Sequence, residues 1–147
     1  MEKIIIDGMT FTLPLFIMAI GGICCERCGI TNLAVEGFSG VGAFFGAFSA
    51  VICMRIFNIS PGTAHYTALV FAMLGGMLFA MLHGLLCIRF KADQVISGIV
   101  MNLLGQALTV FLVKTINRNV FGQPSDKFDL GVSTRFNVPF ISDIPLL

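Results

Sequence analysis

Four stretches of the sequence carry no charged residue and are long enough to cross a membrane as helices. A bilayer core is spanned by about 20 apolar residues in a helix. The helix is required because a backbone N–H or C=O group without a partner in hydrocarbon costs several kcal/mol. The sequence therefore predicts an all-α, polytopic transmembrane helix bundle of about four spans. The stretches contain 18, 18, 33 and 20 residues and are Gly8–Cys25, Gly37–Met54, Ile56–Ile88 and Gln94–Val113.

Composition excludes most functions of soluble proteins. Hydrophobic residues make up 56% of the chain and charged residues 12%, and this charged share is about half that of a soluble domain. The formal net charge of +1 provides no basic field for nucleic acid. The sequence has no Gly-x-x-x-x-Gly-Lys-Ser/Thr motif, so any ATP hydrolysis has to occur on another chain. We predict a membrane protein that is not an enzyme and needs no cofactor.

The five cysteines and two histidines do not form a metal-binding pattern. Cys25 and Cys28 make a C-x-x-C pair, which could be a metal or redox site. A structural zinc ion needs four ligands, however, and the sequence offers neither a second pair nor a nearby histidine. His65 and His83 lie about 27 Å apart along a helix, too far to share an ion. Packing is the better interpretation for the cysteines, and a hydrogen-bonded packing role for His83.

Polar breaks divide the chain into spans. We predict spans at residues 9–25, 33–57, 64–88 and 94–113, and a broken or re-entrant segment near residues 26–37, where charged residues interrupt the apolar runs. Residues 114–137 form a polar loop. Residues 138–147 become apolar again and read as the approach to a further, missing span.

Small residues recur every four positions in two of the predicted spans. One series is Gly42, Gly46 and Ala50, and the other is Gly76, Ala80 and Gly84. In lipid, such faces let helix backbones approach closely. We expect both faces to need helical partners.

The charged residues Glu26, Arg27 and Glu36, together with the polar Asn32 between them, are the first candidate site, either a substrate pathway or a structural polar cluster. Charges at membrane depth are costly and usually line a pathway or pair internally. The alternative is an interfacial loop with solvated charges. We expect Arg27 to lie within ion-pair distance of Glu26 or Glu36.

One side of the fourth predicted span is polar. Gln94, Ser97, Asn102 and Gln106 fall within about half of the helix circumference at 100° per residue. They could line a route for a polar substrate, or they could hydrogen-bond to neighbouring helices. In both cases they should face protein or water, whereas the other side should face lipid or apolar neighbours. That apolar side includes Ile96, Ile99, Leu103 and Val110.

Two blocks of the sequence resemble a known family. The first follows the pattern Glu-Arg-x-Gly-x-x-Asn-x-x-x-Glu-Gly and then Gly-Ala-Phe. The second follows Ala-x-Gln-x-x-Ser-Gly and then Asn-Leu. In this order and spacing they resemble the permease subunits of bacterial ABC importers of the simple-sugar and nucleoside type, which are related to branched-chain amino acid permeases. The matching residues are Glu26, Arg27, Gly29, Asn32, Glu36, Gly37, Gly42, Ala43, Phe44, Ala92, Gln94, Ser97, Gly98, Asn102 and Leu103.

The resemblance implies a role as well as a fold. It covers about the first half of a typical member, so the chain would be a partial transmembrane permease domain of a multi-pass protein in the bacterial plasma membrane. It would form part of the pathway for a small polar solute, such as a nucleoside or simple sugar. Implied partners are a second permease subunit, a cytoplasmic ABC ATPase, an extracytoplasmic substrate-binding lipoprotein and the lipid bilayer.

Two other functions are compatible with the same residues. A secondary transporter or channel subunit would use charges such as Glu36 for ion coupling, and a non-transporting membrane scaffold is a further possibility. Orientation is also open. The resemblance places the 114–137 loop outside the cell, whereas the positive-inside rule favours the reverse, because the loop is rich in lysine and arginine.

Overall fold

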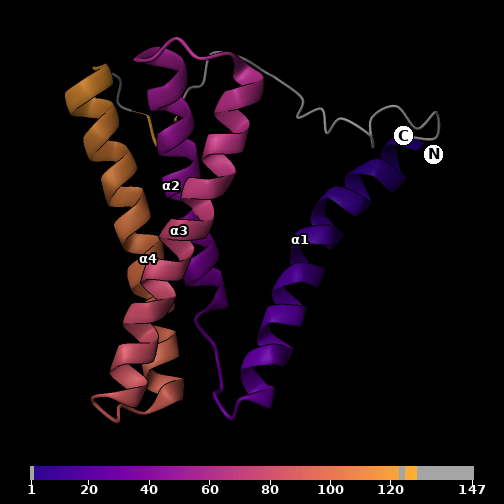
Figure 1. Cartoon of the computed structure of the whole chain (residues 1–147), viewed down its shortest axis with the longest axis vertical. Coiled ribbons are helices and arrows are strands. Elements are labelled where there is room, and N and C mark those ends of the chain that lie inside the picture. The colour runs from indigo at the N-terminus through magenta and orange to yellow at the C-terminus, as the bar shows by residue number, and fades with distance from the viewer. Residues whose placement is uncertain (1, 123–124, 129–147) are drawn as a thin grey trace.

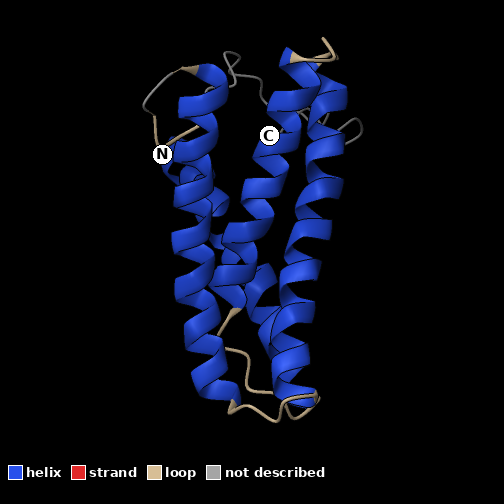
Figure 2. Cartoon of the chain, turned by 90° about the vertical axis from the view of Figure 1, so that its left-hand side faces the viewer, coloured by secondary structure: helices blue, strands red, loops and turns tan. Residues whose placement is uncertain are grey.

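The computed structural model describes residues 2–122 and 125–128. Within these residues all of the regular secondary structure is helical, and the predicted all-α class is confirmed. Most of the helices lie roughly along one axis, with the described loops near their ends (Figure 2). In chain order they are α1 (Glu2–Arg27), α2 (Val35–Arg55), α3 (Pro61–Ile88), α4 (Gln94–Ile116) and the short π-helix η1 (Asn117–Phe121).

The helices α2, α3 and α4 form a bundle, and α1 stands apart from it (Figure 1). Consecutive helices run in opposite directions, and α2 packs against both α3 and α4. The core of the bundle contains Ala34, Val41, Phe79 and Met101, all of which are buried. The candidate site lies where the chain enters this bundle from α1.

Three helices among the described residues are long and apolar enough to cross a membrane: Val35–Arg55, Pro61–Ile88 and Gln94–Phe121. Many of their large apolar side chains are exposed, as expected for surfaces that meet lipid. The predicted span at 9–25 lies within α1. Helix continues from α4 through η1 to Phe121, beyond the predicted end of the fourth span at residue 113. The apolar segment predicted at 138–147 lies outside the described residues.

Glycine lets α2 and α3 pack closely. A Cβ atom added at Gly42 would lie 2.9 Å from the carbonyl oxygen of Ala72, and one added at Gly46 would lie 3.0 Å from that of Ala68. The first small-residue face therefore finds its partner within the chain. The second face is used only in part, because Gly76 lies against Gly42 while Gly84 has open space around its Cβ position.

Helix α4 has a side-chain cap at its N-terminus. The Asp93 carboxylate accepts hydrogen bonds from the backbone N–H groups of Val95 and Ile96, at 2.9 and 3.0 Å. These donors would otherwise lack partners in the first turn. The cap fixes where α4 begins, and so fixes the height of Gln94 and Asn102 on its surface.

Candidate functional site

The first element of the site is the turn that ends α1. Gly29 has a φ of +78°, a left-handed conformation that glycine adopts without a Cβ penalty. Its N–H donates to the carbonyl of Glu26 at 2.9 Å, and the Ile30 N–H donates to that of Cys25 at 3.1 Å. This pair of bonds is a Schellman motif, which closes the helix and turns the chain towards α2.

The chain between this turn and α2 is not helical, and two of its N–H groups bond to side chains. The Thr31 N–H donates to Oε1 of Gln94 at 3.0 Å, and the Ala34 N–H donates to Oδ1 of Asn32 at 3.0 Å. Non-helical backbone survives at membrane depth only where protein or water satisfies it. Gln94 and Asn32 provide two of these partners.

The first turn of α2 is capped by a residue from another helix. The N-cap position, Ala34, has no side chain able to accept a hydrogen bond. Instead, the Gly37 N–H donates to the side-chain oxygen of Asn102 on α4. The Asn102 amide nitrogen in turn donates to Oε2 of Glu36 at 3.4 Å. Glu36 therefore holds the Asn102 amide with its oxygen facing Gly37.

Glycines bring the two backbones close enough for these bonds. A Cβ added at Gly105 would lie 3.0 Å from Cα and O of Gly37, and one added at Gly37 would lie 2.8 Å from the Met101 carbonyl oxygen. One added at Gly98 would lie 3.1 Å from Cβ of Leu33. We call this contact of residues 31–37 with α4 the cap interface. Its α4 side consists of Gln94, Gly98, Met101, Asn102 and Gly105.

Ser97 points into a different contact, between α4 and α3. Its hydroxyl lies 3.0 Å from Nδ1 of His83, and both residues are buried. The Cys87 sulfur lies 3.8 Å from Nε2 of the same ring. The Phe38 ring, on α2, lies 5.8 Å from the imidazole. His83 is thus packed among three helices, in keeping with its predicted hydrogen-bonded role.

The remaining predicted site residues lie elsewhere. Glu26, Arg27 and Gln106 are exposed. The expected ion pair of Arg27 with Glu26 or Glu36 is not formed; the ion pair among the described residues is Lys114–Asp126. Glu36 faces Asn102 instead. The structure therefore gathers Asn32, Glu36, Gln94 and Asn102 at the cap interface and leaves the α1 charges at the surface.

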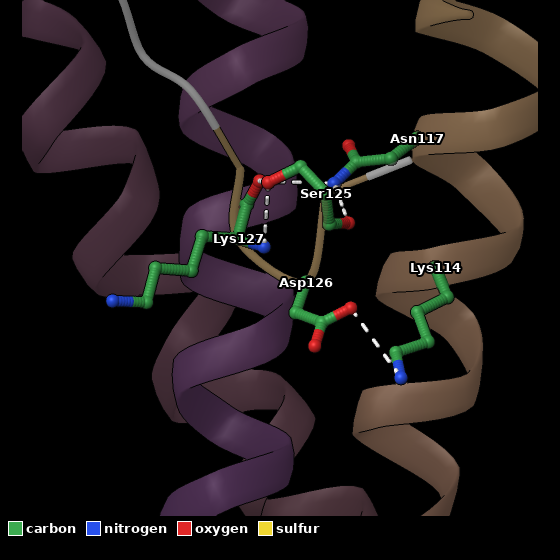
Figure 3. Close-up of polar contacts among 5 residues, drawn as sticks. All are labelled: Lys114, Asn117, Ser125, Asp126 and Lys127. Atoms are coloured by element: carbon green, nitrogen blue, oxygen red, sulfur yellow. Dashed lines mark hydrogen bonds and ion pairs between the residues drawn. The ribbon is translucent and has the colours of Figure 1, made fainter. Parts of the chain in front are cut away.

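A second polar cluster, not predicted from the sequence, lies at the opposite end of α4 (Figure 3). The buried Asn117 side chain donates to the carbonyl oxygens of Ser125 and Lys127, at 2.7 and 2.9 Å. Lys114 forms its ion pair with Asp126 beside them, at 3.4 Å. These residues fall in and beside a predicted loop without periodicity, so no spacing pattern indicates that they meet.

Among the described residues, no three His, Cys, Asp or Glu side chains are placed to hold one metal ion. The chemistry of the cap interface is that of neutral amides, one carboxylate and backbone donors. Such groups fix helices against each other and can also hydrogen-bond a polar solute.

Comparison with known proteins identifies the family. The family model described as branched-chain amino acid transport system / permease component matches residues 4–147. The nucleoside ABC transporter permease protein NupC of Lactococcus lactis subsp. cremoris is 31% identical over 100% of this chain and 44% of its own length. The guanosine ABC transporter permease protein NupQ of Bacillus subtilis is 32% identical over 95% of this chain and 41% of its own.

A third relative is the putative glucose ABC transporter permease protein TsgC13 of Haloferax volcanii, 30% identical over 88% of this chain and 37% of its own. The chain thus spans less than half the length of these curated relatives. No solved structure matches it.

Proposed function

Since the chain belongs to the family of branched-chain amino acid transport system permease components, we propose that it forms part of the membrane pathway of an ATP-driven importer. The observation that carries the proposal is the family match over residues 4–147. The apolar helices support it, because they give the chain the character of a multi-pass membrane protein. The permease makes no covalent bond; it alternates between arrangements whose populations are biased by nucleotide on a partner.

We propose a nucleoside as the solute. Two relatives that align with 100% and 95% of this chain are named for nucleoside and guanosine transport. A third is named for glucose and is aligned with a smaller share. A nucleoside offers hydroxyl groups and base edges, which amide and hydroxyl side chains can hydrogen-bond without a net charge.

The proposed partners follow from the importer architecture. They are a second permease subunit, a cytoplasmic ABC ATPase and an extracytoplasmic substrate-binding lipoprotein, assembled in a bacterial plasma membrane. The 147 residues contain no Walker-type motif, and we propose that a separate chain supplies the ATPase.

We assign different roles to the predicted site residues. Asn32, Glu36, Gln94 and Asn102 form hydrogen bonds with backbone N–H groups, with each other and with the Cys25 sulfur. We assign them the role of holding the entry of α2 against α4. Ser97 serves the contact with α3. Gln106 is exposed one turn beyond Asn102, and Glu26 and Arg27 are exposed at the end of α1. These three are the candidates for contact with solute or water.

Uptake measurements test the proposal. Radiolabelled guanosine, uridine and glucose should be supplied to bacteria with the gene present, deleted and restored. Nucleoside uptake should fall on deletion and return on restoration, while glucose uptake stays constant. Unchanged uptake of all three would reject a transport role. Loss of glucose uptake alone would reject the nucleoside.

The energy source separates an ABC importer from a secondary transporter. Uptake should stop when cellular ATP is depleted and should survive a protonophore that leaves ATP in place. The reverse pattern would favour ion coupling. Co-purification of an ATPase and a lipoprotein with the tagged permease tests the proposed partners directly.

A further inference from the structure

The far end of α4 carries a small polar pocket that the proposed transport function does not use. Its volume is about 310 Å³, and its walls are Lys114, Arg118, Ser125 and Asp126. Asp126 points towards Lys114, whereas the Lys127 side chain points away to the other side (Figure 3). The Lys127 side chain therefore does not line the pocket, whereas Asp126 does.

The wall opposite α4 is held in place from two sides. Asn117 is only 3% exposed and donates to the carbonyl oxygens of both Ser125 and Lys127. On the other side, the Phe128 ring lies 5.9 Å from that of Phe44 and 6.2 Å from that of Phe48, both on α2. The pocket is thus preformed, because its wall is fastened to two helices.

The pocket has an excess of positive charge. The Lys114 ammonium lies 3.4 Å from Oδ1 of Asp126. Arg118 follows Lys114 by four residues and so lies on the same side of the helix. Within the described part of the chain, the Arg118 guanidinium has no ion-pair partner. Two cations therefore share one carboxylate, and the guanidinium is available to an anion from outside.

The charge-free length of α4 matches a bilayer core, which would place the pocket at the level of lipid headgroups. Lys114 is the first charged residue after Asp93, and 21 residues of helix extend for about 32 Å. This equals the thickness of a bilayer hydrocarbon core, about 30 Å. Val110 and Phe111 precede Lys114 on the same helix face and are 51% and 64% exposed. They offer apolar contact directly on the hydrocarbon side of the two cations.

We propose that this pocket binds the headgroup phosphate of an anionic phospholipid. Lys114 and Arg118 donate to the phosphate oxygens, and the planar guanidinium can do so through two parallel bonds. The acyl chains lie along Val110 and Phe111. Asp126 competes with the phosphate for Lys114, so it lowers the affinity and keeps the lipid exchangeable. This inference does not depend on the proposed transport function.

Lipid retention tests the inference. The protein should be reconstituted in bilayers of phosphatidylglycerol and phosphatidylcholine, extracted, and examined by native mass spectrometry for bound lipid. We expect selective retention of phosphatidylglycerol. Each cation removed near a charged surface should weaken binding about fivefold. Lys114→Gln with Arg118→Gln should therefore reduce retention strongly, and Asp126→Asn should increase it.

A matched control removes two cations from the other end of the bundle, as Arg89→Gln with Lys91→Asn; asparagine suits the left-handed backbone of Lys91. Retention should stay at the wild-type level. Equal loss in this control would show a general charge effect and overturn the site.

Soluble glycerol phosphate that displaces the lipid at equal concentration would identify a free anion as the ligand and also overturn the proposal. A fall in retention with Asp126→Asn would contradict the competition. Circular dichroism confirms that each variant is folded.

Discussion

The side-chain oxygen of Asn102 accepts a hydrogen bond from the backbone N–H of Gly37, 65 residues earlier in the chain. Gly37 lies in the first turn of α2, where N–H groups have no partner within the helix. A residue of α4 therefore completes the N-terminus of α2. Glu36 fixes the orientation of the Asn102 amide by accepting from its nitrogen.

Replacing Asn102 by Ala should destabilise the bundle. The loss of a capping acceptor costs about 1–2 kcal/mol, and the Gly37 N–H is left without its partner. Thermal unfolding in detergent should show a lower midpoint.

Asn102→Asp keeps the acceptor but places a carboxylate beside that of Glu36, so it should also destabilise. Asn119→Ala, which changes an exposed amide on η1, is the control. If Asn102→Ala unfolds at the same temperature as this control, the cap has no energetic role.

Gly105→Ala should prevent α4 from approaching residue 37. The added methyl group would lie 3.0 Å from the backbone of Gly37, and backbone cannot move aside as a flexible side chain can. Overpacking of this kind costs about 1–3 kcal/mol. The matched control is Gly40→Ala in α2, where nothing lies within 4 Å of the new Cβ and alanine is favoured in helix by up to about 1 kcal/mol. Opposite shifts of the unfolding midpoint are expected, and equal shifts would contradict the close contact.

The contact of Ser97 with His83 should contribute to the packing of α4 on α3. Ser97→Ala removes the hydroxyl 3.0 Å from Nδ1 of the buried imidazole. A buried polar group left without a partner costs about 1–3 kcal/mol. Ser39→Ala provides the comparison, because its hydroxyl is exposed and bonds only within its own turn. A stability loss of the same size in both variants would show that the interhelical contact is not responsible.

Arg27→Ala should have little effect on stability, within about 0.5 kcal/mol, because Arg27 is exposed and forms no ion pair with Glu26 or Glu36. Its effect should appear, if at all, in uptake. Measuring both quantities separates the roles: a loss of uptake at wild-type stability supports solute or water contact. A large loss of stability would show that Arg27 has a buried partner after all.

Cysteine labelling tests which face of α4 meets water. In a cysteine-free background, Gln106→Cys should react with a membrane-impermeant thiol reagent, and solute should slow that reaction. Leu103→Cys, exposed on the apolar side, should face lipid and react poorly. Equal reaction at the two positions would exclude this part of α4 from an aqueous pathway.

The helices of the fold, and some of the contacts between them, were predictable from the sequence. A bilayer requires apolar runs of helix length, and such runs can be recognised in the sequence without a structure. The polar face of the fourth span was predicted to meet protein, and Gln94 and Asn102 do so. Their partners were not predictable, since the side-chain oxygens accept from backbone N–H groups, which every residue except proline carries. Only the register of the 31–37 segment along α4 selects Thr31 and Gly37.

The expected ion pair of Arg27 failed for a related reason. Opposite charges near each other in sequence suggest pairing, but Gly29 turns the chain after α1 and carries Glu36 away to the bundle. There the exposed Glu36 carboxylate accepts a hydrogen bond from the Asn102 amide nitrogen. The cluster around Asn117 was missed because it depends on a non-periodic turn.

The cap across 65 residues also sets an order of assembly during synthesis. At about 5–20 residues per second, the ribosome needs about 3–13 s to extend the chain from Gly37 to Asn102. Throughout that interval the first turn of α2 lacks its final acceptor, although α2 itself can already enter the membrane. The first turn of α2 is therefore capped only after α4 has been synthesised. An insertion factor that shields this turn would act within that time.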